Sequence, residues 1–155
     1  MGDQPSAAQV LLTRPRGRNE ALAQALRQAG LAVIEAPALA IERLDTPRPP
    51  AQPGDLLIFV SGQAVAAYFS TRTAPWPAGA WAGAVGSATA RALRAHVPPD
   101  RILAPADGLP PDSESLLAVI RARSLSAGQA HILRADQGRD WLADQLRQQG
   151  WRVAC

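Results

Sequence analysis

The chain contains an internal repeat, because residues 10–33 match residues 130–153 when the sequence is shifted by 120 positions. Between positions 14 and 33, eight of twenty residues are identical in the two copies. The identical pairs are Arg14/Arg134, Leu22/Leu142, Ala23/Ala143, Leu26/Leu146, Arg27/Arg147, Gln28/Gln148, Gly30/Gly150 and Val33/Val153. Each copy has the pattern of a strand, an amphipathic helix, a glycine and a return strand. The period is too long for a solenoid, and it predicts two related α/β domains.

Strand-like and helix-like segments alternate along the whole chain. The expected strands cover residues 9–14, 31–44, 56–61, 81–86, 101–104, 130–134 and 151–155. The expected helices cover residues 20–29, 62–70, 87–96, about 113–123 and 139–149. Asn19 and either Asp112 or Ser113 are the expected helix N-caps. This alternation predicts an α/β fold with a parallel sheet flanked by helices, of the flavodoxin/Rossmann-like kind.

Composition limits the classes of function. The chain is 47% hydrophobic and 19% charged, which is ordinary for a globular protein, and it has no apolar run of the roughly 20 residues that a membrane span needs. Cys155 is its one cysteine, so a multi-cysteine metal site is excluded and a reducing, cytoplasmic setting is favoured. Its basic side chains are all arginine and are spread out, whereas a nucleic-acid partner would require a concentrated basic face.

Ligands of parallel sheets bind beyond the carboxyl ends of the strands, so residues just after the strands are candidates. The expected substrate-binding residues are Thr13, Arg14, Ser61, Gly62, Gly86, Thr89 and Arg134. Free N–H groups at the start of a helix attract anions, but a simple helix cap explains Ser61 equally well. The two arginines suit a carboxylate, although a solvated side chain explains them too. No catalytic residue is identified, because the sequence offers no nucleophile–histidine–acid arrangement and no P-loop.

The same segments resemble uroporphyrinogen-III synthases. The opening segment VLLTRPRGRNEALAQALRQAGLAV is similar to that family's N-terminal signature, centred on Thr13-Arg14-Pro15. Four further blocks follow in the family's order: VSGQAV at 60–65, AVGSATARAL at 84–93, DSESLL at 112–117 and HILRADQGRDWLADQLRQQGWRV at 131–153. Two positions depart from the family pattern, with Gln63 where asparagine is usual and Ala135 where glycine is usual. No single block is specific, but the ordered set is.

The resemblance implies a fold and a reaction. Residues 1–36 would be the N-terminal βα part of a discontinuous first domain, 37–152 the second domain, and 153–155 the start of a strand returning to the first. The reaction implied is the cyclisation of hydroxymethylbilane to uroporphyrinogen III, with loss of water and inversion of the last pyrrole ring. No cofactor is implied. The substrate carries eight carboxylates, which suits arginines and helix N-termini at strand ends.

The family continues for roughly another 100 residues, about one domain's length. We therefore expect this chain to be a fragment or short form with little activity, and the family's active-site tyrosine has no counterpart in Tyr68. The first βα unit would then leave Leu22 and Leu26 uncovered, so we expect that unit either to mediate a homodimer or to be disordered. Two alternatives stay open. One is a non-catalytic α/β module that binds an anionic ligand or a partner protein, and the other is an unrelated flavodoxin-like regulatory domain.

Overall fold

A computed structural model describes residues 8–41, 47–70, 72, 74–135 and 140–155 of the chain. The chain divides into two compact units, Met1–Asp45 and Thr46–Cys155. Each unit is built around a parallel sheet, so the predicted α/β class with helices flanking parallel strands is confirmed.

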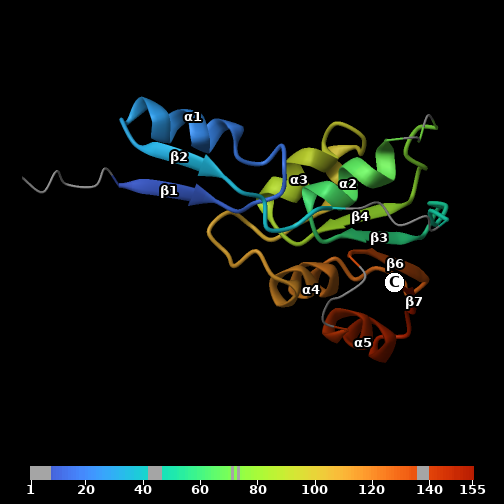
Figure 1. The fold of residues 1–155 in the computed structure, drawn as a ribbon. Helices are drawn as coiled ribbons and strands as arrows, with labels where there is room; N and C mark the ends of the chain where they lie inside the picture. Colours follow the sequence, from blue (N-terminus) through green and yellow to red (C-terminus); the bar gives the residue numbers. More distant parts are fainter. Residues whose placement is uncertain (1–7, 42–46, 71, 73, 136–139) are drawn as a thin grey trace, which may run out of the picture. The chain divides into compact units, whose positions relative to one another are not determined.

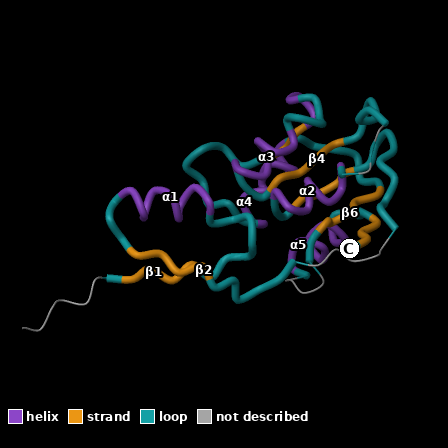
Figure 2. The backbone as a smooth tube through the Cα atoms, turned by 45° about the horizontal axis from the view of Figure 1, so that its top comes forward, coloured by secondary structure: helices purple, strands orange, loops and turns teal. Residues whose placement is uncertain are grey.

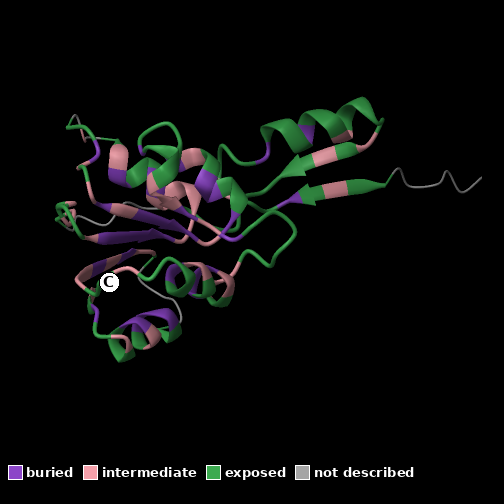
Figure 3. Ribbon diagram, turned by 180° about the vertical axis from the view of Figure 1, so that it is seen from behind, coloured by how far each residue is buried: buried purple, intermediate pink, exposed green. Residues whose placement is uncertain are grey.

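The first unit is a single β–α–β motif. Strand β1 (Gln9–Leu12) leads into helix α1 (Glu20–Gln28), and strand β2 (Ala32–Glu35) returns parallel to β1 (Figure 2). Ala23 on α1 is fully buried. The unit leaves much of its apolar surface in solvent, and Figure 3 shows both strands largely exposed. Leu11 and Ile34, which are neighbours across the two strands, are 57% and 47% exposed.

The second unit contains five strands and four α-helices among its described residues. In chain order these are β3 (Leu56–Phe59), α2 (Gly62–Phe69), β4 (Trp81–Ala84), α3 (Ser87–Leu93), the 3-10 turn η1 (Pro99–Arg101), β5 (Ile102–Leu103), α4 (Ser113–Ala122), β6 (Gln129–Leu133), α5 (Trp141–Gln148) and β7 (Arg152–Ala154). All neighbouring strands are parallel, and their order across the sheet is β5-β4-β3-β6-β7.

Two hydrophobic clusters cover the two faces of this sheet. Leu56 and Ile58 belong to the cluster beneath α4 and α5, whereas Leu57 and Phe59 belong to the cluster beneath α2 and α3. Consecutive residues of a strand point to opposite faces, so β3 must be apolar throughout to serve both clusters. Figure 1 shows α2 and α3 on one side of the sheet and α4 and α5 on the other. The unit is thus a three-layer sandwich with a buried central strand.

The two copies of the internal repeat form the same β–α–β motif, once as β1–α1–β2 and once as β6–α5–β7. In the first unit Gln9 pairs with Ala32, and in the second Gln129 pairs with Arg152, so both pairings keep the 120-residue offset. Gly30 and Gly150 end the equivalent helices at φ +78 and +87, a left-handed conformation that glycine adopts without strain. The two copies therefore share strand register, helix position and the stop signal of the helix.

Several expected boundaries were wrong, for local reasons. The strand expected over 31–44 is confined to Ala32–Glu35, and its end at 42–44 lies outside the described residues. Pro37 lacks the N–H that a continuing strand would need. The helix expected over 87–96 ends at Leu93 and the one expected from 139 begins at Trp141, while positions 136–139 lie outside the described residues.

Asn19 was expected to cap α1, but its side chain accepts no hydrogen bond from the helix. Its Nδ2 instead donates to the carbonyl of Arg14 at 3.3 Å, because its backbone is helical rather than extended. Asp112 is confirmed as a true N-cap, since its Oδ1 accepts from the backbone N–H of Ser115 at 2.8 Å.

Candidate functional site at the carboxyl edge of the sheet

The carboxyl edge of the five-stranded sheet contains the point where the strand order reverses. The chain runs from β3 outward to β4 and β5, then crosses to β6 and continues to β7 on the other side. The helices that follow β3 and β6 therefore leave on opposite faces, and ligands of such sheets usually bind at this kind of reversal point. The backbone N–H of Val60 donates to the carbonyl of Leu133 at 3.3 Å, so the two strand ends stay together up to this point.

Ser61 and Gly62 follow β3 at this edge. The Ser61 hydroxyl accepts a hydrogen bond from the N–H of Ala64 at 3.2 Å, so this side chain caps α2. A Cβ placed on Gly62 would meet nothing within 4 Å. The first turn of α2 thus borders open space, and its backbone can be approached closely there.

Gly86 and Thr89 follow β4, which pairs with β3 so that both strands end at the same edge. A Cβ on Gly86 would lie 2.8 Å from the Cβ of Pro111, so packing alone requires glycine at this position. Thr89 is only 6% exposed and lies in the first turn of α3. Gly86 and Ser61 therefore share an edge as expected, while Thr89 is turned mainly toward the interior.

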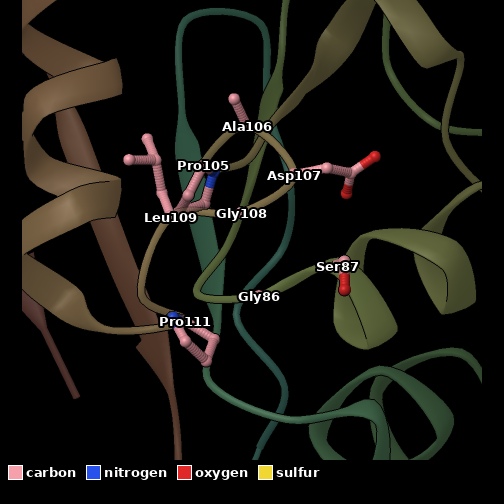
Figure 4. Close-up of a pocket in the computed structure, with 8 residues that line it drawn as sticks. All are labelled: Gly86, Ser87, Pro105, Ala106, Asp107, Gly108, Leu109 and Pro111. Atoms are coloured by element: carbon pink, nitrogen blue, oxygen red, sulfur yellow. The ribbon is translucent and has the colours of Figure 1, made fainter.

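A shallow pocket lies beside Gly86 where β4 and β5 end. Its volume is about 220 Å³, and Figure 4 shows the residues that line it: Gly86, Ser87, Pro105, Ala106, Asp107, Gly108, Leu109 and Pro111. Most of these offer apolar or backbone surface. Asp107 is the one charged residue among them, and it extends on the side of Ser87, away from Leu109.

Arg134 follows β6, on the other side of the switch point. Its guanidinium pairs with the carboxylate of Asp140, the residue that precedes α5. The Arg134 side chain is 17% exposed, and Asp140 is much more open at 65%. Arg134 was expected to meet a carboxylate, and Asp140 of the same chain supplies one.

Thr13 and Arg14 belong to the first unit, in the loop between β1 and α1. Both are exposed, and the backbone N–H of Ala38 donates to the carbonyl of Thr13 at 3.0 Å. The carbonyl of Arg14 accepts from Asn19, which is only 2% exposed. This contact fixes the loop from inside, so the Arg14 side chain is presented to solvent on an ordered backbone.

Five of the seven expected site residues thus lie at one edge of the second unit, namely Ser61, Gly62, Gly86, Thr89 and Arg134. The other two lie in the first unit. Sequence reasoning missed Asp107, because residues 105–111 were treated as a connecting loop. The rule that singled out residues after the other strands also applies to the short strand β5, and it would have found this carboxylate.

Tyr68 has a perturbed acidity. Burial raises the pKa of its phenol above the ordinary value of 10.0, although Arg72 acts in the opposite direction. The hydroxyl donates to the carbonyl of Pro49 at 3.1 Å. Tyr68 lies on the core side of α2, so it stabilises the fold rather than serving the edge.

A model of the uroporphyrinogen-III synthase HemD family matches residues 20–154. The chain belongs to the uroporphyrinogen-III synthase family. The resemblance noted in the sequence blocks is therefore confirmed. No curated protein sequence gave a significant match. In the part of the chain that the structure describes, no helix is long and apolar enough to cross a membrane.

The fold agrees with the family. The chain is similar to the crystal structure of uroporphyrinogen III synthase from the extremely thermophilic bacterium Thermus thermophilus, with a TM-score of 0.51 and 22% sequence identity. The match covers 95% of this chain and 59% of the Thermus chain. This family member therefore spans less than two thirds of the Thermus synthase, and at this identity the likeness establishes the fold.

Proposed function

We propose that the chain is a uroporphyrinogen-III synthase that closes hydroxymethylbilane to uroporphyrinogen III, with loss of water and inversion of the last pyrrole ring. The family match over residues 20–154 carries this proposal. The enzyme would be a cofactor-independent lyase of the cytoplasm. Its catalytic power would come from positioning a reactive intermediate in one geometry, which is the kind of catalysis open to a site without a strong nucleophile.

The chemistry of the edge supports a polycarboxylate substrate. Gly62 offers open backbone at the start of α2, where N–H groups and the helix dipole favour negative charge. Arg14 is exposed and has no side-chain partner among the described residues. Thr13, Ser61 and Gly86 would also contribute to substrate binding, and Thr89 would contribute through the backbone of the first turn of α3, because its side chain is buried. Arg134 would bind substrate through a guanidinium that Asp140 already orients.

The proposal includes a domain organisation. Residues 1–36 would be part of a discontinuous first domain, 37–152 the second domain, and 153–155 the start of the strand that returns to the first. In the described structure, Arg152–Ala154 pairs with β6 at the edge of the second sheet. A strand at the border of two domains can take part in such a pairing while leading out of the sheet.

The 155-residue chain by itself would turn over slowly. Within residues 8–41 the sheet of its first unit has two strands, and Leu11 and Ile34 stay exposed on it. A unit that leaves such apolar side chains exposed is weakly stabilised by packing, so it would unfold locally more often than the second unit and take Thr13 and Arg14 with it. Catalysis by positioning loses rate when the groups that hold the substrate are misplaced.

We further propose that a second copy of the chain covers the first unit. Leu22 is 42% exposed, while Leu142, its equivalent in the repeat, is 3% exposed in the core of the second unit. Among the described residues, the first copy has the same apolar helix face as the second but leaves it exposed. There β1 pairs with β2 alone, so its other edge can pair with another strand.

The reaction is tested with freshly prepared hydroxymethylbilane, by separating the product with the last ring inverted from the product without inversion. We expect the chain to bind the linear tetrapyrrole and to form inverted product slowly but above the uncatalysed background. Arg14→Gln should weaken binding about tenfold, the size expected for a charge-assisted contact. Arg94→Gln, at the far end of α3, is the control and should change nothing. A chain that neither binds the tetrapyrrole nor forms inverted product would contradict the proposal.

A further inference from the structure

The pocket at 86–111 has the wrong charge for the acidic side chains of a tetrapyrrole. Its one charged lining residue is Asp107, and a carboxylate repels another carboxylate. Within the described residues Asp107 makes no hydrogen bond and no ion pair, and neither does the hydroxyl of Ser87. Asp107 is therefore a free acceptor, and a ligand of this pocket must bring a donor.

The walls of the pocket offer apolar surface beside the Asp107 carboxylate, so they can hold a ring that also carries a polar N–H group. Pro105 is buried, and Ala106, Leu109 and Pro111 add hydrocarbon surface around the rim. Its volume of about 220 Å³ is below the roughly 300–1,000 Å³ of pockets that enclose a whole drug-sized ligand. The space suits a single substituted five-membered ring rather than a whole tetrapyrrole.

The pocket also has a defined floor. Gly86 lies against Pro111, with no room for a Cβ between them, so the β4 end and the start of α4 close the pocket from below (Figure 4). Asp112 anchors this corner, since its Oδ1 accepts from Ser115 at 2.8 Å. The wall that carries Asp107 is thus attached to the sheet at both of its ends, through β5 and α4.

We infer that this pocket holds one pyrrole ring of the substrate, with the pyrrole N–H donating to the Asp107 carboxylate and the acidic side chains directed outward. The inference rests on the proposed function. Two surfaces would then bind different parts of the substrate. The pocket would bind one ring through its N–H, and the open edge at Gly62 and Arg134 would bind carboxylates. The outward orientation follows from charge, because the carboxylates of the ring must avoid Asp107.

The test uses the full 155-residue chain and a monopyrrole that carries one acetate, one propionate and no amine, together with its N-methyl analogue. Amide signals of Gly86, Ser87 and Gly108 are followed by NMR during titration. We expect the monopyrrole to shift these signals and the N-methyl analogue, which has no N–H, to bind at least fivefold more weakly. Asp107→Ala should weaken monopyrrole binding about five- to tenfold, while Asp107→Asn, which keeps an acceptor oxygen, should retain part of it.

Asp100→Asn is the matched control, because Asp100 is exposed and precedes β5, whereas Asp107 follows it. Unchanged or tighter monopyrrole binding by Asp107→Ala, or equal binding of the N-methyl analogue, would overturn the inference. So would a titration that leaves the pocket signals in place. If hydroxymethylbilane still binds in any of these cases, the pocket assignment fails and the proposed function stands; if no tetrapyrrole binds, the proposed function itself fails.

Discussion

Gly62 and Gly86 follow neighbouring strands and begin neighbouring helices, yet they should respond in opposite ways to alanine. A Cβ on Gly86 would lie 2.8 Å from the Cβ of Pro111, well inside the roughly 3.5–4.0 Å at which carbon atoms pack best. A Cβ on Gly62 would meet nothing within 4 Å. Gly86→Ala should therefore destabilise the second unit, whereas Gly62→Ala should not.

The magnitude follows from how far Pro111 can move. Its neighbour Asp112 caps α4 through Ser115, and the N–H of Asp112 donates to the carbonyl of Pro110 at 3.0 Å, so the segment is tied on both sides. Inserting one methyl group into such a corner costs about 1–3 kcal/mol. Part of this is offset, because replacing glycine reduces the entropy of the unfolded chain by about 0.4–1 kcal/mol. We expect a net loss of about 1–2 kcal/mol for Gly86→Ala.

Gly62→Ala also reduces the entropy of the unfolded chain, but its new methyl group meets no other atom. It should therefore stabilise the second unit by about 0.4–1 kcal/mol. Urea unfolding followed by circular dichroism measures both variants against the parent chain. The Gly86→Ala variant should also lose its response to the monopyrrole, because Pro111 forms part of the pocket. Equal stability of the two variants would refute the argument, since it would show that the 105–111 segment does not press on the sheet.

The remaining predictions concern the two copies of the repeat, the buried phenol and the assembly. In urea unfolding, Leu142→Ala should lower the free energy of unfolding by about 2–5 kcal/mol, because Leu142 is only 3% exposed. Leu22→Ala should lower it by under about 1 kcal/mol, because Leu22 is 42% exposed. Equal losses would mean that another surface covers α1. Tyr68→Phe should cost about 0.5–1.5 kcal/mol at neutral pH through loss of the bond to Pro49. Since folding raises the Tyr68 pKa, the stability that the phenol contributes is complete below pH 10.0 and is lost as the pH rises further. The difference in stability between the parent chain and Tyr68→Phe should therefore shrink above pH 10.0. A difference that stays constant with pH would contradict the burial argument. Analytical ultracentrifugation should show a dimer of the full chain and a monomer after removal of residues 1–35, and a monomeric full chain with an ordered N-terminus would end the dimer proposal.

Much of the fold could be predicted, because the strands and helices follow from the hydrophobic pattern of short segments. The apolar run at 56–61 predicted a buried parallel strand, and residues 56–59 form that strand and are fully buried. The repeat predicted two β–α–β motifs, and the two have the same register. Element ends were less predictable. Asn19 had the residue type of an N-cap, but its backbone conformation turned the side chain toward the carbonyl of Arg14.

The candidate site was predicted only as a position. Placing ligand-binding residues after parallel strands located Ser61, Gly86 and Arg134 at one edge. The contacts that each of these residues makes could not be predicted from the sequence. Arg134 is paired with Asp140, six residues away, and no local pattern predicted this ion pair.

By itself the sequence determined the period of each element and, in the two copies of the repeat, the glycine that ends the helix and the pairing of the two strands, since these depend on residues within one motif. Only the tertiary structure decided which apolar faces are covered. Leu22 and Leu142 are identical in type, in register and in place on their helices, yet one is 42% exposed and the other 3%. The same holds for Gly62 and Gly86, of which only the second meets a proline 25 residues further on. Burial depends on what the rest of the chain brings to a surface, and no local segment encodes that.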